Sequence, residues 1–454
     1  MTHCYKLMGK NIVIDAFSAS IHAVDDVAFD VIGMYETSTA DEIAALMLDK
    51  YSNDETVTNE TLLELFEDIE ALRHGGKLFA DDVSEDVPDE PDSGVIKALC
   101  LHMAHTCNLV CDYCFAGQGR YRGKDALMSL ETAKRAIDFL IANSGSRHNL
   151  EVDFFGGEPL LNWEVLKDTV KYSRDIEGSH GKNIRFTLTT NGVKLNDEVT
   201  EFCNREISNV VLSLDGRRET HDARRKTPSG GGSYDLIVPK FKRFAEQRDG
   251  GYYMRGTYTS QNKDFLSDIL HIAELGFTEL AMEPAVSAEG DPLGLTERDL
   301  PELYMQYELL AQEMAKRQHD GNPLTFYHYT LNLEDGPCAY KRSRGCGSGT
   351  EYFAVTPEGM LYPCHQLVGE TEFIAGNVTD GVMDGYTFRR AGINTRAECR
   401  DCWAKLYCSG GCAANAYHST GDVDGVYSLG CELFKKRLEC AIWLKCEETE
   451  QLEV

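Results

Sequence analysis

The sequence has no long apolar run and comparatively little positive charge. No stretch approaches the roughly 18 consecutive apolar residues that a membrane-spanning helix needs, so we expect no membrane association. The first six residues lack the apolar core of a signal peptide, and we therefore expect a cytoplasmic protein. Lysine and arginine number 45 against 74 aspartate and glutamate residues, giving a net charge of −29 that repels phosphate backbones and anionic lipid. Nucleic acid is therefore not an expected partner.

Cysteine, by contrast, is abundant, with 16 among the 454 residues. In a reducing compartment, clustered cysteines indicate metal ligands rather than disulfides. Cys107, Cys111 and Cys114 follow a C-x3-C-x2-C spacing. Such a triplet can hold three corners of an iron–sulfur cube and leave the fourth iron open to a small molecule. A zinc site is the alternative, although structural zinc sites usually close with four ligands and favour paired C-x2-C spacing.

Between residues 95 and 285, apolar runs alternate with helical patterns, which is typical of parallel β/α units. Six units predict a partial barrel rather than the full eight. Polar or glycine-rich turns follow the strands, and in parallel β/α folds these strand ends meet at one mouth. The predicted strands are 98–103, 151–155, 184–190, 209–214, 252–258 and 279–283, and the predicted helices include 130–142, 163–177, 236–246 and 265–275.

The flanking regions have different patterns. In the N-terminal part, two strands (11–15 and 20–24) and two helices (41–49 and 61–73) predict a winged-helix-like module. Near the C-terminus the apolar pattern is too weak to explain folding by a core alone, so we expect metal to organise that region. The predicted boundaries are 1–80 for the module, 81–94 for an acidic linker, 95–285 for the partial (β/α)6 barrel, 286–335 for a helical bridge, 336–446 for the cysteine-rich region and 447–454 for a tail.

The turn Gly156-Gly157-Glu158-Pro159 follows the second predicted strand of the barrel. Two glycines let the backbone approach a ligand closely, and the Glu158 carboxylate can accept a hydrogen bond from an ammonium group. A C-x3-C-x2-C loop followed one β/α unit later by this turn resembles the radical S-adenosylmethionine superfamily over about residues 95–285. The resemblance implies S-adenosylmethionine as cofactor, which one electron cleaves to a 5′-deoxyadenosyl radical.

The same resemblance implies a set of cofactor contacts and assigns no catalytic residue beyond them. Cys107, Cys111 and Cys114 ligate the reactive 4Fe-4S cluster. Alternatives remain for some contacts: a strand-to-turn cap for Ser213 and Asp215, and an ordinary surface position for either arginine. The implied S-adenosylmethionine contacts are Gly156, Gly157 and Glu158 at the methionine amine, Tyr113 at the adenine, Ser213 and Asp215 at the ribose, and Arg255, or else Arg224, at the methionine carboxylate.

Eight further cysteines lie in the third region, enough for two four-cysteine clusters, with a zinc ribbon as the alternative. Their C-x2-C-x5-C-x3-C spacing, followed by one distant cysteine, resembles the SPASM domain of radical enzymes that modify peptides and proteins. The likeness implies three 4Fe-4S clusters in all. Cys4, Cys100, Cys203, Cys440 and Cys446 are expected to be small buried hydrophobes. The implied ligands are Cys338, Cys346, Cys364 and Cys412 for auxiliary cluster I, where some relatives lack the Cys338 ligand, and Cys399, Cys402, Cys408 and Cys431 for auxiliary cluster II.

Nearly the whole chain resembles the maturases of SCIFF peptides, short for "six cysteines in forty-five residues". The resemblance implies an enzyme that joins a cysteine sulfur to the Cα of an acceptor such as Thr in a ribosomally made, cysteine-rich precursor peptide. Residues 1–80 would bind the leader of that peptide as an added strand, and a flavodoxin- or ferredoxin-type protein would donate electrons. Formylglycine formation, a C–C crosslink, and a zinc-organised binding protein without catalysis are the alternatives. The resemblance rests on Met8-Gly-Lys-Asn-Ile-Val-Ile-Asp15, Leu150-Glu-Val-Asp-Phe-Phe-Gly-Gly-Glu-Pro159, Gly336-Pro-Cys-Ala-Tyr-Lys341 and Arg400-Asp-Cys-Trp-Ala-Lys405.

Overall fold

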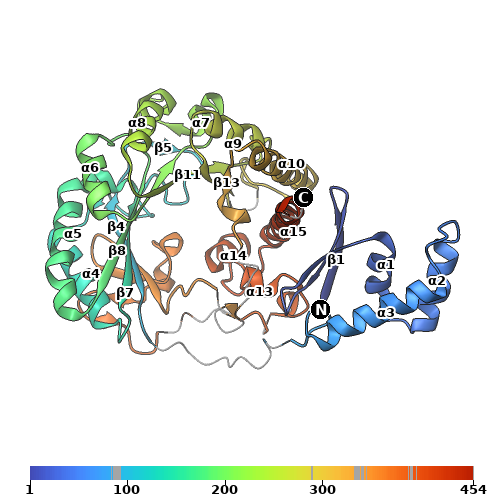
Figure 1. Cartoon of the computed structure of the whole chain (residues 1–454). Helices are drawn as coiled ribbons and strands as arrows, with labels where there is room; N and C mark the ends of the chain where they lie inside the picture. The colour runs from blue at the N-terminus through green and yellow to red at the C-terminus, as the bar shows by residue number, and fades with distance from the viewer. Residues whose placement is uncertain are drawn as a thin grey trace.

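An open barrel of parallel strands forms the centre of the molecule, with helices on its outer side (Figure 1). The α/β class and all six predicted barrel strands are confirmed, with ends that differ by at most two residues. In spatial order the strands are β4 (Ala98–His105), β7 (Asn149–Gly156), β8 (Asn183–Thr190), β9 (Asn209–Ser213), β11 (Gly251–Tyr258) and β12 (Glu279–Pro284). This computed structural model describes residues 1–82, 84, 94–287, 290–331, 338, 342–343, 345–386, 388, 392–394 and 396–452.

The outer helices cover the strand faces that point away from the barrel interior. On β7, Val152 and Phe154 are fully buried on that face, and Phe154 stacks on Phe186 of β8 with ring centroids 5.4 Å apart. The strands therefore form the inner layer of a core that the helices complete. The four predicted helices are confirmed within this layer, which consists of α4 (Leu130–Ala142), α5 (Trp163–Glu177), α6 (Asp197–Glu206), α7 (Arg218–Arg224), α8 (Tyr234–Gln247) and α9 (Phe265–Glu274).

The cysteine-rich region continues the barrel sheet, which the sequence did not predict. Strand β14 (Tyr352–Val355) pairs in parallel with β4, and three short antiparallel strands extend the sheet from there. A small apolar cluster around Leu367 lies within this region, and a second one around Ala354 is shared with the barrel, so metal is not its only organising element. The extending strands are β15 (Met360–Tyr362), β16 (Gly376–Asn377) and β17 (Gly381–Val382), and β13 (Thr325–Phe326) pairs with β12 at the other edge.

The remaining helices connect the barrel to the cysteine-rich region. Helix α15 (Ser428–Leu452) runs without interruption through residue 446, so residues 447–452 are helical and not a separate tail as predicted. It packs along α10 (Leu300–His319), which lies in the segment expected to be a helical bridge. No helix in the described part of the chain is long and apolar enough to cross a membrane. The short helices are α12 (Ala397–Arg400), α13 (Lys405–Cys408) and α14 (Ala413–Thr420).

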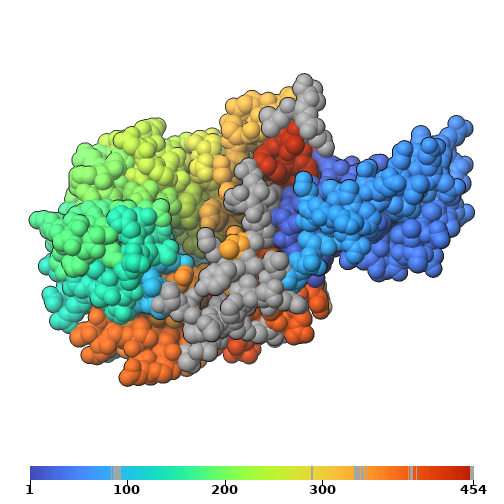
Figure 2. Space-filling model, turned by 60° about the horizontal axis from the view of Figure 1, so that its bottom comes forward, coloured from blue at the N-terminus to red at the C-terminus, as the bar shows by residue number. Residues whose placement is uncertain are grey.

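The N-terminal module is a three-stranded antiparallel sheet with three helices on one face, and it projects from the body of the molecule (Figure 2). Its own core gathers around Val13, Ile43 and Ile69. The two predicted strands and two predicted helices are present, whereas the first strand and the first helix were missed. In order, the elements are β1 (Thr2–Leu7), β2 (Lys10–Asp15), β3 (Ile21–Val24), α1 (Asp26–Met34), α2 (Ala40–Lys50) and α3 (Asn59–His74).

Strand β1 fastens this module to the last helix. The Tyr5 hydroxyl donates to the backbone oxygen of Glu439 at 3.1 Å, and the His3 ring lies 3.0 Å from the carboxylate of the same residue. The His3 ring also stacks on Trp403, with centroids 4.0 Å apart. Lys405 pairs with Asp82 just after the module, although residues 83 and 85–93 of the expected linker lie outside the described part of the chain. The module is therefore anchored beside the cysteine-rich region.

Asp15 links the turn after β2 to the end of the N-terminal module through hydrogen bonds, and its replacement tests that role. Its buried carboxylate accepts from the backbone N–H groups of Ser18 at 2.8 Å and Ala80 at 3.0 Å, among others. An Asp15→Ala substitution leaves these donors unpaired, and we expect a loss of about 2–4 kcal/mol of local stability. Amide hydrogen exchange at Ser18 and Ala80 measures it. Asp54→Ala, which removes an exposed carboxylate bonded only to Thr56, is the control; equal effects of the two substitutions would contradict the prediction.

Candidate functional site

The three cysteines of the first triplet line one large cavity at the mouth of the barrel. Cys107, Cys111 and Cys114 follow the end of β4 and face a cavity of about 1030 Å³. Burial raises the pKa of Cys107 to about 11 and that of Cys111 to about 12, and the charges of the neighbouring thiols act in the same direction. The three sulfurs are therefore within electrostatic reach of one another. Thiols in this environment keep their protons until a cation replaces them.

The glycine turn packs on the backbone just before these cysteines. A Cβ added to Gly157 would lie 2.1 Å from the Thr106 carbonyl oxygen, and the Gly157 N–H donates to the Ala104 carbonyl at 2.7 Å. Gly156 has φ +114°, a region that favours glycine. The sequence predicted close approach to a ligand; the structure shows that close approach to the chain's own backbone is what requires both glycines. Both still line the cavity.

Glu158 is buried and held by three donors. Its carboxylate accepts from the Thr190 hydroxyl at 2.8 Å and from the backbone N–H groups of Asn191 at 2.8 Å and Leu160 at 3.1 Å. Burial raises the pKa of Glu158 to about 7 despite these bonds. The loop that follows β8 thus fixes the orientation of the carboxylate that the sequence predicted to face S-adenosylmethionine.

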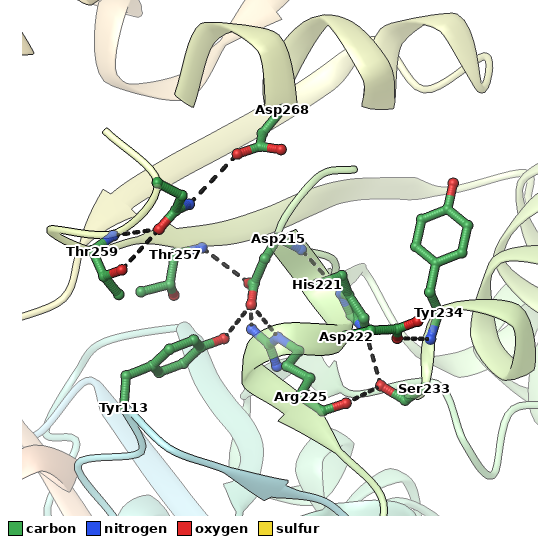
Figure 3. A network of polar contacts seen from close by, with 11 residues as sticks. Tyr113, Asp215, His221, Asp222, Arg225, Ser233, Tyr234, Thr257, Thr259 and Asp268 are labelled. Carbon is green, nitrogen blue, oxygen red and sulfur yellow. Dashed lines mark hydrogen bonds and ion pairs between the residues drawn. The ribbon is translucent and has the colours of Figure 1, made fainter. Parts of the chain in front are cut away.

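Asp215 and Tyr113 belong to a buried polar network that includes Arg225 and Thr257 (Figure 3). Arg225 donates to both carboxylate oxygens of Asp215, at 2.9 and 3.0 Å, and the Tyr113 hydroxyl donates at 2.5 Å. The Thr257 N–H adds a further bond at 3.1 Å. Burial opposes ionisation of Asp215, but the charge of Arg225 holds its pKa below the usual value. Asp215 is thus fully engaged by the protein itself.

The other predicted contact residues separate into two groups. Ser213 and Arg255 are paired across β9 and β11 and both line the cavity, where Arg255 donates to Glu283 at 2.5 Å. Arg224 instead pairs with Asp112 at 2.7 Å and is not among the cavity-lining residues. Its neighbour Arg225 takes the inner position, because β10 (Arg225–Lys226) pairs with β5 (Val110–Cys111) beside the cysteine loop.

Cysteines of the third region fall into two groups by their mutual electrostatic effects. The pKa of Cys431 is raised to about 12 by burial and then by Cys408, Cys399 and Cys402. Burial likewise raises the pKa of Cys364, followed by Cys412 and Cys346. Cys338 is exposed, and the neighbouring positions 336–337 and 339–341 of its predicted motif lie outside the described residues. Within the described residues, no three His, Cys, Asp or Glu side chains converge closely enough to chelate one metal ion.

Two residues of the site were missed from the sequence. Asn191 donates to the Asn108 side chain at 2.8 Å and lies 3.6 Å from the Cys107 sulfur. Asn191 lies in one of the polar turns that follow the strands, but nothing in the sequence indicates its contact with the cysteine loop. Arg225 was overlooked in favour of Arg224, because two adjacent arginines in a sequence do not reveal which one points inward.

This combination of a parallel barrel and a three-cysteine loop defines a class of enzyme domain, and residues 101–270 match the model of the Radical SAM superfamily. The segment is a radical S-adenosylmethionine domain. The chain is 24% identical over 362 residues to the cysteine-type anaerobic sulfatase-maturating enzyme of Clostridium perfringens, covering 74% of this chain and 93% of that protein.

Two solved structures share the fold. Native anSMEcpe with bound AdoMet and Kp18Cys peptide superposes with a TM-score of 0.63 at 20% identity, covering 79% of this chain and 99% of that one. Streptococcus suis SuiB bound to precursor peptide SuiA superposes with a TM-score of 0.52 at 16% identity, covering 92% and 95%. The second match extends over most of the chain.

Adjacent arginines provide a matched test of the buried network. Arg225→Ala leaves the Asp215 carboxylate buried without a cation, and we expect it to lower the free energy of unfolding by about 3–5 kcal/mol. Arg224→Ala removes a pair with a partly exposed carboxylate and should cost no more than about 1 kcal/mol. Denaturant unfolding of both variants measures the difference, and similar losses would contradict the assignment of Arg225 as the inner residue.

Proposed function

We propose that the protein is a radical S-adenosylmethionine peptide maturase that forms intramolecular thioethers between a cysteine sulfur and the Cα of an acceptor such as Thr. The observation that carries the proposal is that a single cavity is lined both by the first cysteine triplet and by cysteines of the third region, including Cys412 and Cys431. A peptide in that cavity would touch both parts of the chain. Solved neighbours of the same fold hold peptides, namely Kp18Cys in anSMEcpe and SuiA in SuiB.

The donor set fits a reactive iron–sulfur cluster with S-adenosylmethionine beside it. Cys107, Cys111 and Cys114 would hold three irons, since thiolates are the preferred ligands of such clusters. When bound, this group would supply an electron and a 5′-deoxyadenosyl radical that takes a hydrogen atom from the substrate carbon. Glu158, fixed by its three donors, would orient the methionine amine, and the residues proposed around the rest of the cofactor are Tyr113, Gly156, Gly157, Ser213, Asp215 and Arg255, with Arg224 held apart by Asp112.

The cysteine groups of the third region would hold two auxiliary 4Fe-4S clusters. The electrostatic effects of Cys399, Cys402 and Cys408 on the pKa of Cys431 support these four residues as the ligands of auxiliary cluster II. The effects of Cys412 and Cys346 on the pKa of Cys364 support three of the four ligands of auxiliary cluster I. Cys338 stays the proposed fourth ligand of auxiliary cluster I. Clusters within reach of the shared cavity would let the surplus electron of a radical reaction leave the substrate.

The N-terminal module would bind the leader of a cysteine-rich precursor peptide. Among the described strands β3 pairs only with β2, whereas β2 has a partner on each side. β1 is covered by its contacts with α15. An extended leader can therefore add to β3 by main-chain hydrogen bonds. A flavodoxin- or ferredoxin-type protein is the proposed electron donor.

Formylglycine formation is the second candidate function, because a sulfatase-maturating enzyme is among the relatives that match most of this chain. The N-terminal module favours peptide maturation, since oxidation of a Cys or Ser to formylglycine in a protein requires no leader recognition. The same scaffold could instead carry out a C–C crosslink, and the same cysteines could organise zinc in a binding protein without catalysis.

Mass spectrometry of a co-expressed peptide distinguishes these chemistries. We expect a short cysteine-rich reading frame beside the gene, and its product is the peptide to co-express. Each thioether removes two hydrogen atoms and protects one thiol from alkylation, so the mass loss and the number of blocked thiols should rise together. A product with an aldehyde that reacts with a hydrazide would indicate formylglycine instead, and a hydrogen loss with every thiol still alkylated would indicate a C–C crosslink.

Metal analysis of cysteine variants tests the proposed clusters. Anaerobically purified protein should contain roughly 12 irons with matching sulfide, as three cubes require. The triple variant Cys107→Ala, Cys111→Ala, Cys114→Ala should retain roughly 8 irons and lose reductive cleavage of S-adenosylmethionine, because only the reactive cluster is removed. The result that would overturn the radical assignment is stoichiometric zinc without sulfide in the unmodified protein.

A further inference from the structure

Deeper in the barrel than the residues proposed to hold S-adenosylmethionine, there is a carboxylate for which the described residues supply no counter-ion. Asp153 is on β7, three residues before Gly156, and its side chain lines the same cavity. In the sheet register it lies between Cys100 of β4 and Thr187 of β8, and these two residues also line the cavity. At about 3.3 Å per residue, Asp153 is about 10 Å from Gly156 along the strand. It therefore lies deeper in the barrel than the residues proposed to hold S-adenosylmethionine.

Other buried carboxylates of this barrel are satisfied by the protein. Glu158 has three donors, Asp215 has Arg225, and Asp268 accepts from the backbone and the side chain of Arg217 at 3.0 and 2.8 Å. Glu283, which is partly exposed and also lines the cavity, pairs with Arg255. The described residues thus give a hydrogen-bond or ion-pair partner to each of these carboxylates, whereas Asp153 has no ion-pair partner among them.

Asp153 receives one hydrogen bond, from Thr187, and no Lys, Arg or His of the described residues forms an ion pair with it. Burial, followed by the charge of Glu151, raises its pKa to about 6. Glu151 itself is exposed and pairs with Arg185 at the surface. A half-buried carboxylate that faces a cavity with one weak partner is costly unless a ligand supplies a donor.

The groups around Asp153 are uncharged and polar. Tyr253 of β11 and Tyr352 of β14 line the same part of the cavity, and both interact electrostatically with Asp153. The Tyr352 hydroxyl lies 3.3 Å from Nδ1 of His365, which follows Cys364. The pocket therefore joins the barrel floor to the cysteine-rich region, and its lining can receive a side chain that carries a hydrogen-bond donor.

We infer that Asp153 is a specificity-determining residue, which accepts a hydrogen bond from a hydroxyl or ammonium group on the peptide residue that enters the barrel. The inference rests on the proposed function, since it takes a peptide as the occupant of the cavity. A site built around an acceptor rejects a substrate without the donor, because the buried acceptor is then left unpaired. Asp153 would thus select the residue that is presented to the cofactor.

Peptide variants with the iron-loaded full-length protein test this selection. The probes are the co-expressed cysteine-rich peptide, a form with every Thr and Ser of its core replaced by Val and Ala, and a form with every core Lys replaced by Met. The readout is kcat/KM for peptide-stimulated formation of 5′-deoxyadenosine. We expect the unmodified protein to discriminate against one donor-free form by between about 10-fold and 100-fold. The form that is rejected identifies the donor as a hydroxyl or as an ammonium group.

The discrimination should depend on Asp153. In Asp153→Ala, the kcat/KM values for the unmodified peptide and for the rejected donor-free form should differ by no more than about 3-fold. Asp153→Asn keeps an acceptor of the same size, so it should retain most of a preference for a hydroxyl and little of a preference for an ammonium group. Glu151→Gln, a carboxylate change two residues away and outside the cavity, is the control and should keep the full ratio. If the alanine variant fails to incorporate iron, Asp153→Val, which has a similar size and no acceptor, takes its place and should lower the discrimination in the same way.

The outcomes separate this inference from the proposed function. No discrimination by the unmodified protein, or an unchanged ratio in Asp153→Ala, overturns the role of Asp153 even when thioethers are formed. Discrimination that depends on Asp153 supports that role even when the product proves to be another modification.

Discussion

Between Thr106 and Gly157, two stretches of backbone meet with no room for a side chain. Thr106 directly precedes the first cysteine of the triplet and Gly157 directly precedes Glu158, so their contact fixes how the cysteine loop and the carboxylate lie relative to each other. The end of the cysteine loop is tied to the same point, because the Tyr121 hydroxyl donates to the Gly156 carbonyl at 3.3 Å. Fixing these groups before any ligand binds lowers the entropy lost on binding. The rest of the site is arranged around this junction.

Sequence patterns predicted the barrel well because its strands are buried on the helix-covered face and its helices are regularly amphipathic. They failed where a segment is stabilised by distant partners. Strand β1 is polar in part, and its Tyr5 and Leu7 pack into the main core instead of the module's own. The pairing of β14 with β4 joins residues about 250 positions apart, and nothing local signals it. For the site, spacing indicated the cysteine triplet and the glycine turn, whereas the choice between Arg224 and Arg225 needed three-dimensional information.

Charge inside the molecule follows a different rule from charge on its surface. The chain as a whole has a net charge of −29, yet arginines meet carboxylates inside the barrel: Arg217 pairs with the buried Asp268, Arg225 with the buried Asp215, and Arg255 with the partly exposed Glu283. The pairs of Arg217 with Asp268 and of Arg255 with Glu283 also join neighbouring β/α units, whereas Arg225 and Asp215 both follow β9 within one unit. Buried pairs of this kind add little net stability, but they penalise alternative packings in which either partner is left alone.

The covering of β1 by α15 has a consequence for synthesis on the ribosome. Strand β1 donates from Tyr5 to the backbone oxygen of Glu439, so its final packing requires a residue that is translated 434 positions later. Domains generally fold in the order in which they emerge, but this module cannot dock until the C-terminal helix has left the exit tunnel. Until then the face of the cysteine-rich region around Trp403 lacks its cover. Docking of β1 therefore follows the synthesis of α15, and until then the face around Trp403 stays open to solvent.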